Sequence, residues 1–344
     1  MIRNVVTIGN IKLGGNNPIV IQSMTTSKTS NISQTIKQIN FFAKHGIKMV
    51  RVSVLDDNDA NALKKICQIS PIPIIADIHY VAKYAINAIK NGVSKIRINP
   101  NNINNKIDIV KIIQYAKKHH VAIRIGINSG NFKFQKNIPI EQQLVKFTIK
   151  WIKFFEKNNF KNLVISIKDS NPDITYKANV LLSKKCHYPI HLGVTEAGPN
   201  FQATVNSCMG LIPLLKQKIG NTIRISLNGS KDEEIKCAKL ILNSLGKYKI
   251  YHHIIACPLC GRNKYSTIKW VKQIDNFLND KNIVATVAIM GCNINCVGEA
   301  RKSDVAICVK TNKISSLFIK GKYIKDIRNS NVITTLKKIL SIKL

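Results

Sequence analysis

Three cysteines near the carboxyl terminus have the spacing of a metal or redox centre. Cys257 and Cys260 form a CxxC motif directly after a short apolar run, and Cys292 follows the next apolar run expected to be a parallel strand. The carboxyl ends of adjacent parallel strands lie side by side, so these three thiols are expected to converge. Thiolates are soft ligands that hold zinc or iron–sulfur clusters. The pattern therefore predicts a sulfur-ligated site.

Three kinds of sulfur site are compatible with this spacing. A closed structural zinc site would use Cys257, Cys260, Cys292 and Cys296. A redox disulfide within the CxxC motif would need a thioredoxin-like setting, which the sequence lacks. An iron–sulfur cluster could take a carboxylate as fourth ligand, and Cys292, Cys296 and Glu299 share one face if a helix begins there. Spacing alone leaves zinc and iron–sulfur equally open.

The other cysteines carry less information. Four of them lie among apolar residues in expected helices and are predicted to be buried, inert thiols, namely Cys67, Cys186, Cys208 and Cys237. Cys308 stands in an apolar run near the carboxyl terminus. It is expected either to be a buried thiol or to lie near the sulfur site.

A second set of candidate residues is basic and follows short apolar runs. Only eight of the 53 basic residues are Arg, and four of these stand at such positions: Arg51, Arg97, Arg124 and Arg224. Arg grips a phosphate or carboxylate with two parallel bonds, which Lys cannot do. Cations gathered at one place repel one another unless an anion lies between them. The pattern predicts a pocket for a small substrate with more than one phosphate.

The apolar runs that precede these residues recur eight times, with helical periodicity between them. They cover residues 18–24, 47–54, 72–79, 94–99, 121–127, 162–168, 189–196 and 222–227. Near-continuous apolar strands that alternate with helices indicate a parallel sheet covered by helices. Eight units in about 245 residues match a (β/α)8 TIM-type barrel, whose active site forms at the carboxyl ends of the strands. A doubly wound open sheet is the alternative, but the glycine-rich first turn is missing.

The pattern changes after Gly246, which predicts a barrel domain at 1–246 and a small α/β domain at 247–344. The second domain is expected to contain strands at 247–251, 252–256, 283–290 and 304–309, helices at 265–279 and from about 331, and a Lys-rich hairpin at 315–325. The sulfur site belongs to this domain.

The formal charge of +35 does not by itself indicate a nucleic-acid partner. Lys residues are scattered along the whole chain, and aromatic residues, 6% of the total, do not cluster with them. Abundant Lys, Asn and Ile are typical of A/T-rich codon usage. No apolar run approaches the ~20 residues of a membrane span, and residues 1–10 lack the apolar core of a signal peptide. A cytoplasmic protein with no nucleic-acid or membrane partner is expected.

Several strings resemble one family, the bacterial 4-hydroxy-3-methylbut-2-enyl diphosphate synthases. In the barrel they are IQSMT at 21–25, ADIH at 76–79, RINP at 97–100, RIG at 124–126 and LGVTEAG at 192–198. The CPLC motif at 257–260, Gly291-Cys292 and the GEA string at 298–300 continue the series in the same order. The resemblance runs from about residue 5 to about residue 300 without large gaps.

The resemblance implies a reductive enzyme of non-mevalonate isoprenoid biosynthesis. Such an enzyme opens 2-C-methyl-D-erythritol 2,4-cyclodiphosphate and removes one oxygen as water, using two electrons from flavodoxin or ferredoxin. It further implies one 4Fe–4S cluster per chain, and a homodimer in which the cluster domain of one chain covers the barrel of the other.

The resemblance also assigns roles to residues. Cys257, Cys260, Cys292 and Glu299 would hold the cluster, and Glu196 would be the acid that protonates the departing oxygen. The substrate's phosphates would be bound by Arg51, His79, Arg97, Arg124, Asn128, Lys168, Arg224 and Ser226.

The chain departs from the family where the third cysteine is followed by Asn295-Cys296-Val297-Gly298-Glu299 in place of a stretch ending Asn-Gly-Pro-Gly-Glu. Cys296 thereby becomes a rival of Glu299 for iron.

Three other functions are compatible with parts of the sequence. One is a zinc-containing polyphosphate- or nucleic-acid-binding protein, and another is a degenerate member of the same family. A third is a metal-dependent aldolase, for which Asp77 and His79 are the only candidate ligands at the strand ends.

Overall fold

The computed structural model describes residues 3–103, 105–246 and 251–342. The chain divides into two compact units, Met1–Ile241 and Leu242–Leu344. The boundary expected at residue 246 stays a prediction, and residues 247–250 of the expected linker strand lie outside the described residues.

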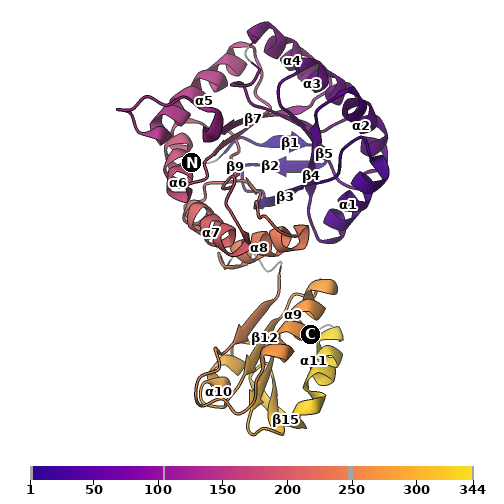
Figure 1. The fold of residues 1–344 in the computed structure, drawn as a ribbon, viewed down its shortest axis with the longest axis vertical. Helices are drawn as coiled ribbons and strands as arrows, with labels where there is room; N and C mark the ends of the chain where they lie inside the picture. The colour runs from indigo at the N-terminus through magenta and orange to yellow at the C-terminus, as the bar shows by residue number, and fades with distance from the viewer. Residues whose placement is uncertain (1–2, 104, 247–250, 343–344) are drawn as a thin grey trace. The chain divides into compact units, whose positions relative to one another are not determined.

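The first unit is a barrel of eight parallel strands ringed by helices, as predicted (Figure 1). The strands follow one another around the barrel in the order β8-β7-β6-β5-β4-β3-β10-β9. A parallel bridge between Ile165 and Ile190 joins the two ends of this order and closes the ring. The strands are β3 Val20–Met24, β4 Met49–Val54, β5 Ile74–Ile78, β6 Lys95–Ile98, β7 Ala122–Asn128, β8 Leu163–Lys168, β9 His191–Leu192 and β10 Thr222–Ile223.

The helices cover the outside of the barrel with their apolar faces. They are α1 Ile32–Lys44, α2 Asp57–Ile69, α3 Ala82–Lys90, α4 Lys106–Lys118, α5 Ile140–Lys157, α6 Pro172–Lys185, α7 Asn200–Lys216 and α8 Lys231–Asn243, with a 3-10 turn η1 at Ser129–Asn131. α1 shows the local reasons: the Asn31 side chain caps its first turn, and Ile39 and Phe42 are buried against the strands. Its two Lys residues, Lys37 and Lys44, are exposed to solvent.

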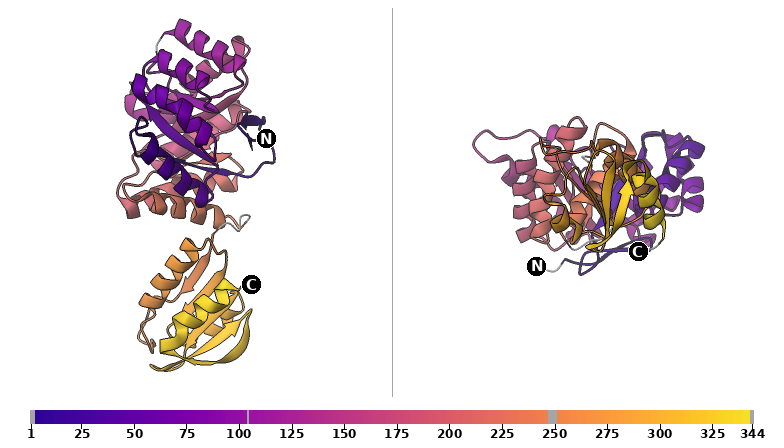
Figure 2. Two further views of the ribbon diagram at one scale, coloured as in Figure 1. Left: turned by 90° about the vertical axis from the view of Figure 1, so that its right-hand side faces the viewer. Right: turned by 90° about the horizontal axis from the view of Figure 1, so that it is seen from below.

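A short hairpin that the sequence did not indicate precedes the barrel. It consists of β1 Val6–Ile8 and β2 Ile11–Leu13, paired antiparallel. Val6, Ile8 and Leu13 pack against the first inward-facing residues of the barrel strands, including Val20 and Met49. The hairpin therefore fills the amino-terminal end of the barrel (Figure 2).

The second unit is a five-stranded mixed sheet in the order β11-β12-β13-β14-β15. Its strands are β11 His253–Ala256, β12 Thr286–Met290, β13 Val305–Val309, β14 Ile314–Ile319 and β15 Lys322–Arg328. Its helices are α9 Ile268–Asp280, α10 Cys296–Ala300 and α11 Val332–Ser341, with a 3-10 turn η2 at Asn329–Asn331. α9 and α11 bury Trp270, Ile274 and Leu336 with the central strands. The strands expected at 252–256, 283–290 and 304–309, the hairpin and the last helix lie where the sequence placed them.

Two expectations from the sequence are corrected in the second unit and around the barrel. The helix expected to begin at Cys292 begins at Cys296, so Cys292 lies in the preceding turn and does not share a helix face with Glu299. Cys67 and Cys208 are half-buried, whereas Cys186 and Cys237 are buried as expected.

Among the described residues, no helix is both long enough and apolar enough to cross a membrane.

Candidate functional site

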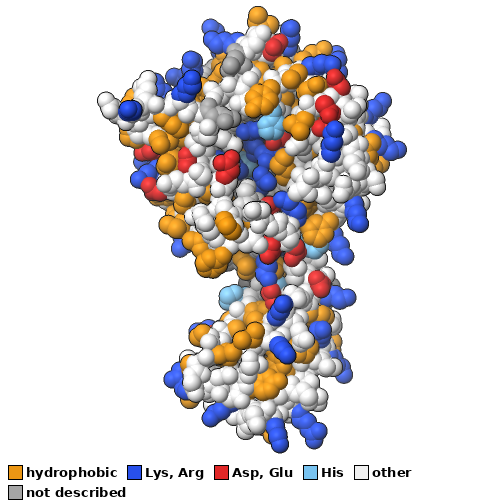
Figure 3. All heavy atoms as spheres, viewed as in Figure 1, with side chains coloured by type: hydrophobic (Ala, Val, Ile, Leu, Met, Phe, Trp, Pro, Cys, Tyr) orange, Lys and Arg blue, Asp and Glu red, His pale blue; other side chains and the backbone are white. Residues whose placement is uncertain are grey.

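Basic side chains line the carboxyl-terminal mouth of the barrel. Arg51, Arg97 and Arg124 stand on β4, β6 and β7, where β5 lies between β4 and β6. Their side chains face the interior, and Arg97 pairs in register with Arg124. Lys168 ends β8. These four side chains are less than one-tenth exposed. In the space-filling view, Lys and Arg atoms form the floor of a hollow in this face of the unit (Figure 3). The predicted convergence of cations is thus present.

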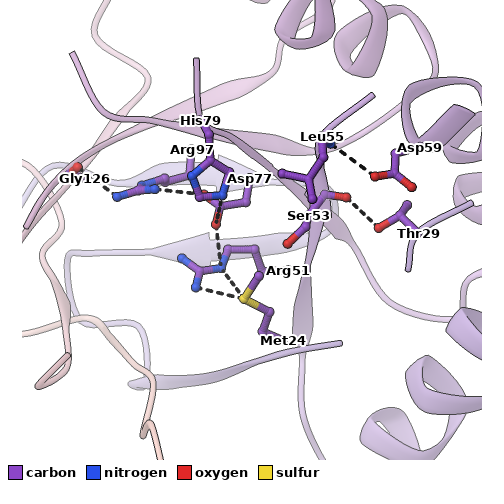
Figure 4. A network of polar contacts seen from close by, with 10 residues as sticks. All are labelled: Met24, Thr29, Arg51, Ser53, Leu55, Asp59, Asp77, His79, Arg97 and Gly126. Atoms are coloured by element: carbon purple, nitrogen blue, oxygen red, sulfur yellow. Dashed lines mark hydrogen bonds and ion pairs between the residues drawn. The ribbon is translucent and has the colours of Figure 1, made fainter. Parts of the chain in front are cut away.

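One carboxylate holds several of these cations in place. Asp77, on β5 and 3% exposed, accepts a charged hydrogen bond from Nη1 of Arg97 at 3.2 Å. Its other oxygen lies 3.6 Å from Nε of Arg51 and 3.6 Å from Nε2 of His79 (Figure 4). Burial alone would raise the pKa of Asp77, but Arg51, Arg97 and Arg124 outweigh it and hold the pKa well below its usual value. Asp77 is therefore a fixed anion that orients the cations around it.

Each arginine of this network has a second partner that fixes its plane. Nε and Nη2 of Arg51 lie 3.1 and 2.9 Å from the sulfur of Met24, at the end of β3. Nη2 of Arg97 donates to the backbone carbonyl of Gly126 at 3.2 Å. A Cβ at Gly126 would come within 2.6 Å of Nε of Arg97, so Arg97 keeps this position only beside a glycine. The guanidinium groups are consequently held before any ligand arrives.

The cations greatly outnumber the anions in the barrel interior. Lys95, fully buried one layer below Arg97, has the thioether of Met49 at 3.6 Å as its hydrogen-bond partner. Burial, reinforced by Arg124, holds the pKa values of Lys95 and Lys168 well below their usual range. Burial also lowers the pKa of Arg51 to about 10, although Asp77 opposes the shift. An anion bound at the mouth would relieve this repulsion.

Several buried polar atoms at the mouth lack partners within the described part of the chain. They include Nε and Nη1 of Arg124, Nε of Arg97 and of Arg224, and Nε2 of His191. Buried guanidinium groups without partners are costly. Their presence together indicates a site for a ligand with several acceptor oxygens.

The remaining predicted binding residues lie around the same opening. Asn128 ends β7, His79 follows β5, and Arg224 and Ser226 follow β10, all of them half-buried. Lys168 lies against Gly193, where a Cβ would come within 2.5 Å of its Nζ. The structure thus gathers all eight predicted phosphate-binding residues on one end of the barrel.

Glu196 lies in the loop after β9 and is exposed. It has a φ of 50°, in the left-handed region that favours glycine. Together with Ser226 and Asn228 it lines a pocket of about 340 Å³. A carboxyl group is therefore placed beside a predicted phosphate-binding residue, in a backbone conformation that its surroundings impose.

The cysteines of the second unit lie on two adjoining loops at the ends of β11 and β12. The backbone N–H of Gly291 donates to Sγ of Cys257 at 3.2 Å, and the carbonyl of Gly291 accepts from Lys264 at 2.9 Å. A Cβ at Gly291 would collide with Asn263, so the two loops are in close contact. Cys292 follows Gly291 directly, which brings it to the CxxC loop as expected.

These cysteines have the chemistry of cluster ligands. Hydrogen bonds from the backbone of Arg262 lower the pKa of the exposed Cys260, which favours its thiolate. Cys257 and Cys292 are half-buried, and none of the three forms a disulfide. The described residues contain no group of three or more His, Cys, Asp and Glu side chains arranged around a single metal ion. A 4Fe–4S cluster is larger than one ion, so its ligands stand further apart than those of zinc.

Cys296 lies near Cys257 but is bonded to another cysteine. It forms a disulfide with Cys308 on β13, in a buried cluster with Met290. With this bond formed, Cys296 cannot be a fourth zinc ligand and cannot compete with Glu299 for iron. Glu299 is half-buried on α10 and lies 3.3 Å from Nζ of Lys302.

Three residues of the barrel interior were not predicted from the sequence to belong to the cationic site. Asp77 was noted only as a metal ligand of an aldolase, but it is the counter-charge of two arginines. Its position two residues before His79 on one strand, facing inward, was the available signal. Lys95 and His191 also face inward, two residues before Arg97 and Gly193 in the same alternation, and both are fully buried.

Comparisons with known proteins agree over the whole chain. The model of the GcpE TIM-barrel domain matches residues 3–239, and that of the GcpE protein C-terminal domain matches residues 253–342. A protein of Malacoplasma penetrans (strain HF-2) named 4-hydroxy-3-methylbut-2-en-1-yl diphosphate synthase (flavodoxin) is 42% identical over 341 residues, which cover 98% of this chain and 94% of that protein. A protein of Persephonella marina (strain DSM 14350 / EX-H1) with the same name is 40% identical and covers 97% and 96%.

Solved structures agree with the barrel. A dihydropteroate synthetase crystal structure with bound product superimposes with a TM-score of 0.54 at 13% identity, over 71% of this chain and all of that one. The 7,8-dihydropteroate synthase of Vibrio fischeri ES114 gives 0.51 at 12% identity, over 71% and 99%. Identities this low support the fold alone. The two family models and the relatives at about 40% identity show more: the chain belongs to the GcpE family.

Proposed function

We propose that this chain catalyses the reductive ring opening of 2-C-methyl-D-erythritol 2,4-cyclodiphosphate in non-mevalonate isoprenoid biosynthesis. One substrate molecule takes up two electrons and two protons and yields 4-hydroxy-3-methylbut-2-enyl diphosphate and water. The observation that carries the proposal is the set of buried guanidinium nitrogens at the barrel mouth that lack a hydrogen-bond partner in the described part of the chain, on Arg97, Arg124 and Arg224. Their charge and number suit a small ligand with two phosphates.

Substrate binding is assigned to the cationic mouth. Arg97 and Arg124 are held in one layer by their strand register, with Arg51 and Arg97 oriented by Asp77. Two phosphates would satisfy the unpaired donors and cancel the repulsion between the cations. The residues proposed to bind them are Arg51, His79, Arg97, Arg124, Asn128, Lys168, Arg224 and Ser226.

Glu196 is proposed to supply the proton to the departing oxygen. Hydroxide is a poor leaving group, and a positioned acid contributes about 10²–10⁴-fold to such a step. Glu196 and Ser226 line the same pocket, so an acid there would lie beside a bound phosphate. The backbone of Glu196 is in the left-handed conformation, which is found in loops and not in regular helices or strands.

The electrons are proposed to come from one 4Fe–4S cluster per chain, held by Cys257, Cys260, Cys292 and Glu299. When bound, the cluster supplies electrons one at a time to the substrate. The residues fit this role because two adjoining loops bring the three thiols together, and Cys260 has a lowered pKa. Cys296 is buried beside Cys308 and Met290, so the half-buried Glu299 is proposed as the fourth ligand.

The proposed electron donor is flavodoxin or ferredoxin, and the proposed setting is the cytoplasm, whose reducing conditions preserve thiolate ligands. The phosphate site and the cysteines belong to separate units, so electrons reach the substrate only where two such units meet. We propose, as the family resemblance implies, a homodimer in which the cluster unit of one chain covers the barrel of the other. Phe201, Val205 and Met209, exposed at four-residue spacing on α7, would give a second copy an apolar contact.

The test is anaerobic purification followed by metal analysis, a visible spectrum and an assay with the cyclic diphosphate and a chemical one-electron reductant. We expect about four irons per chain, broad absorption that bleaches on reduction, and formation of the linear diphosphate. One zinc per chain and a colourless protein would contradict the redox role and leave a phosphate-binding barrel. Sedimentation of the wild type and a Phe201→Ser variant tests the dimer independently.

A further inference from the structure

Two cysteines in the second unit are joined although neither belongs to the expected cluster. Cys296 is the first residue of α10, and Cys308 lies on β13. They form a disulfide with Cα atoms 5.7 Å apart, within the usual range for such a bond. Cys296 is 0% exposed and Cys308 is 2% exposed.

The backbone brings these two sulfurs together without help from the bond. β13 lies between β12 and β14, and Cys308 pairs in register with Met290, the last residue of β12. The turn after Met290 leads into α10, which returns across the sheet and buries Cys296 and Ala300 on its inner face. Sγ of Cys296 also lies 3.7 Å from the carbonyl of Ile307. Reduced thiols in this fold would still face each other.

The pair is also next to the expected cluster. Cys257 packs against the buried group that Met290, Cys296 and Cys308 form. Cys292 precedes Cys296 by four residues, and Glu299 follows it by three. Asn295, Val297 and Gly298 are exposed, so Cys296 belongs to a five-residue helix whose outer face is in contact with solvent. Local opening of this short helix would admit a small oxidant.

We propose that Cys296 and Cys308 are an oxidisable dithiol, a covalent modification site that ties α10 to the central sheet. A reducing cytoplasm would keep both thiols free, and a peroxide would oxidise them. One thiol reacts with hydrogen peroxide to give a sulfenic acid and one water. The second thiol then displaces a second water and forms the S–S bond. The two thiols thus lose two electrons, and the peroxide is reduced to two waters.

The cross-link has a consequence for the site that rests on the proposed function. α10 carries Glu299, so tying its first residue to β13 fixes the helix that presents the expected fourth ligand. It also removes Cys296 from reaction with Cys257, Cys260 or Cys292 when these are without iron. Oxidation would therefore preserve the arrangement of the site while the cluster is lost.

The cross-link can be identified by mass. The full-length protein, purified anaerobically with a thiol reductant, is exposed to hydrogen peroxide, alkylated under denaturing conditions and digested with trypsin. We expect fragment 282–301, which contains Cys292 and Cys296, to be joined to fragment 303–310, which contains Cys308. The joined pair should persist in Cys292→Ser and disappear in Cys296→Ser and Cys308→Ser. Oxidation of Cys260 shows that the peroxide treatment was effective. If fragment 303–310 of such wild-type protein is alkylated and not joined to another fragment, the proposal is overturned.

A second readout does not depend on iron. Amide hydrogen exchange of segment 296–301 should slow at least about tenfold in the cross-linked protein relative to the reduced protein. The Cys308→Ser variant should exchange at the reduced rate under both conditions. Equal exchange in cross-linked and reduced wild type would overturn the tethering of α10. Iron analysis of the same samples separates this outcome from failure of the cluster assignment, because the cross-link forms whether or not iron is bound.

Discussion

Oδ1 of Asp77 lies 3.2 Å from Nη1 of Arg97, and both side chains are almost completely buried at the barrel mouth. Asp77 is the anion around which Arg51, Arg97 and His79 are arranged. The site therefore presents its cations in a fixed geometry and does not assemble them around the ligand. Such preorganisation lowers the entropy lost on binding.

Replacing Asp77 should disturb both binding and stability. The Asp77→Asn variant leaves buried arginines without their counter-charge, so we expect a loss of about 3 kcal/mol in the free energy of unfolding and at least about tenfold weaker substrate binding. Urea unfolding and equilibrium binding measure the two effects. Asp57→Asn, which removes an exposed ion pair with Lys83, is the matched control and should change neither.

The stability that Asp77 contributes through its arginine partners should be lost at acidic pH. The pKa of Asp77 is lowered in the folded protein, so its stabilising effect is fully present above about pH 4, the unfolded value, and is lost as the pH falls below it. The difference in unfolding free energy between wild type and Asp77→Asn should shrink below that pH. A constant difference from pH 3 to pH 7 would mean that Asp77 does not act through its charge.

A methyl group at Gly126 should displace Arg97 without touching the ligand itself. In Gly126→Ala the new Cβ would lie 2.6 Å from Nε of Arg97, so the guanidinium must move. We expect KM for the cyclic diphosphate to rise about tenfold or more, with iron content unchanged. Gly130→Ala adds a methyl group where no atom lies within 4 Å and serves as the control. An unchanged KM in Gly126→Ala would show that the position of Arg97 is unimportant.

Substrate binding should take up protons. Burial and neighbouring cations lower the pKa of Lys168 in the free protein, and a bound dianion would raise it again. Affinity for the cyclic diphosphate should therefore strengthen as the pH falls below the ordinary pKa of Lys, by at most about tenfold per pH unit for one proton. Calorimetry in buffers of different ionisation enthalpy counts the protons. Lys168→Arg, which stays charged throughout, should flatten the dependence; an unchanged slope would assign the proton to another group.

Glu196→Gln should separate binding from chemistry. The amide keeps the size and the loop position of the side chain but cannot donate a carboxyl proton. We expect kcat to fall about 10²-fold or more, with the visible spectrum, iron content and substrate affinity preserved. Glu141→Gln, on α5, is the control for a general loss of negative charge. Turnover within threefold of wild type would exclude Glu196 as the acid.

Reduction by an acidic flavodoxin should depend on salt. The formal charge of +35 is large enough to steer a negatively charged partner. The second-order rate of reduction should fall about tenfold or more between low and high ionic strength. A small neutral reductant provides the comparison, since its rate should change little. Equal rates for flavodoxin at both ionic strengths would rule out electrostatic docking.

The barrel could be predicted because each strand is buried on both faces. Such strands appear in the sequence as short β-branched runs, and the eight runs match β3 to β10 in order. Polar residues at the ends of these runs then had to meet at the mouth, as Arg97 and Arg124 do. The second unit followed from the same signals, down to the hairpin of β14 and β15.

Other features depend on contacts that no local pattern contains. β1 and β2 are three residues each, too short to show a period. The bond between Cys296 and Cys308 depends on the register of β13 against β12 and on where α10 begins. The role of Asp77 became evident only from its distances to Arg51 and Arg97. The left-handed φ of Glu196 has no signature in residue type.

The hairpin of β1 and β2 closes one end of the barrel, so the barrel interior is open at the other end only. Val6, Ile8 and Leu13 fill its amino-terminal end. Substrate must therefore enter, and product must leave, through the same opening. Product release has to come before the next substrate binds. A bound product blocks the next substrate, so the cations that bind the phosphates also affect the rate of product release.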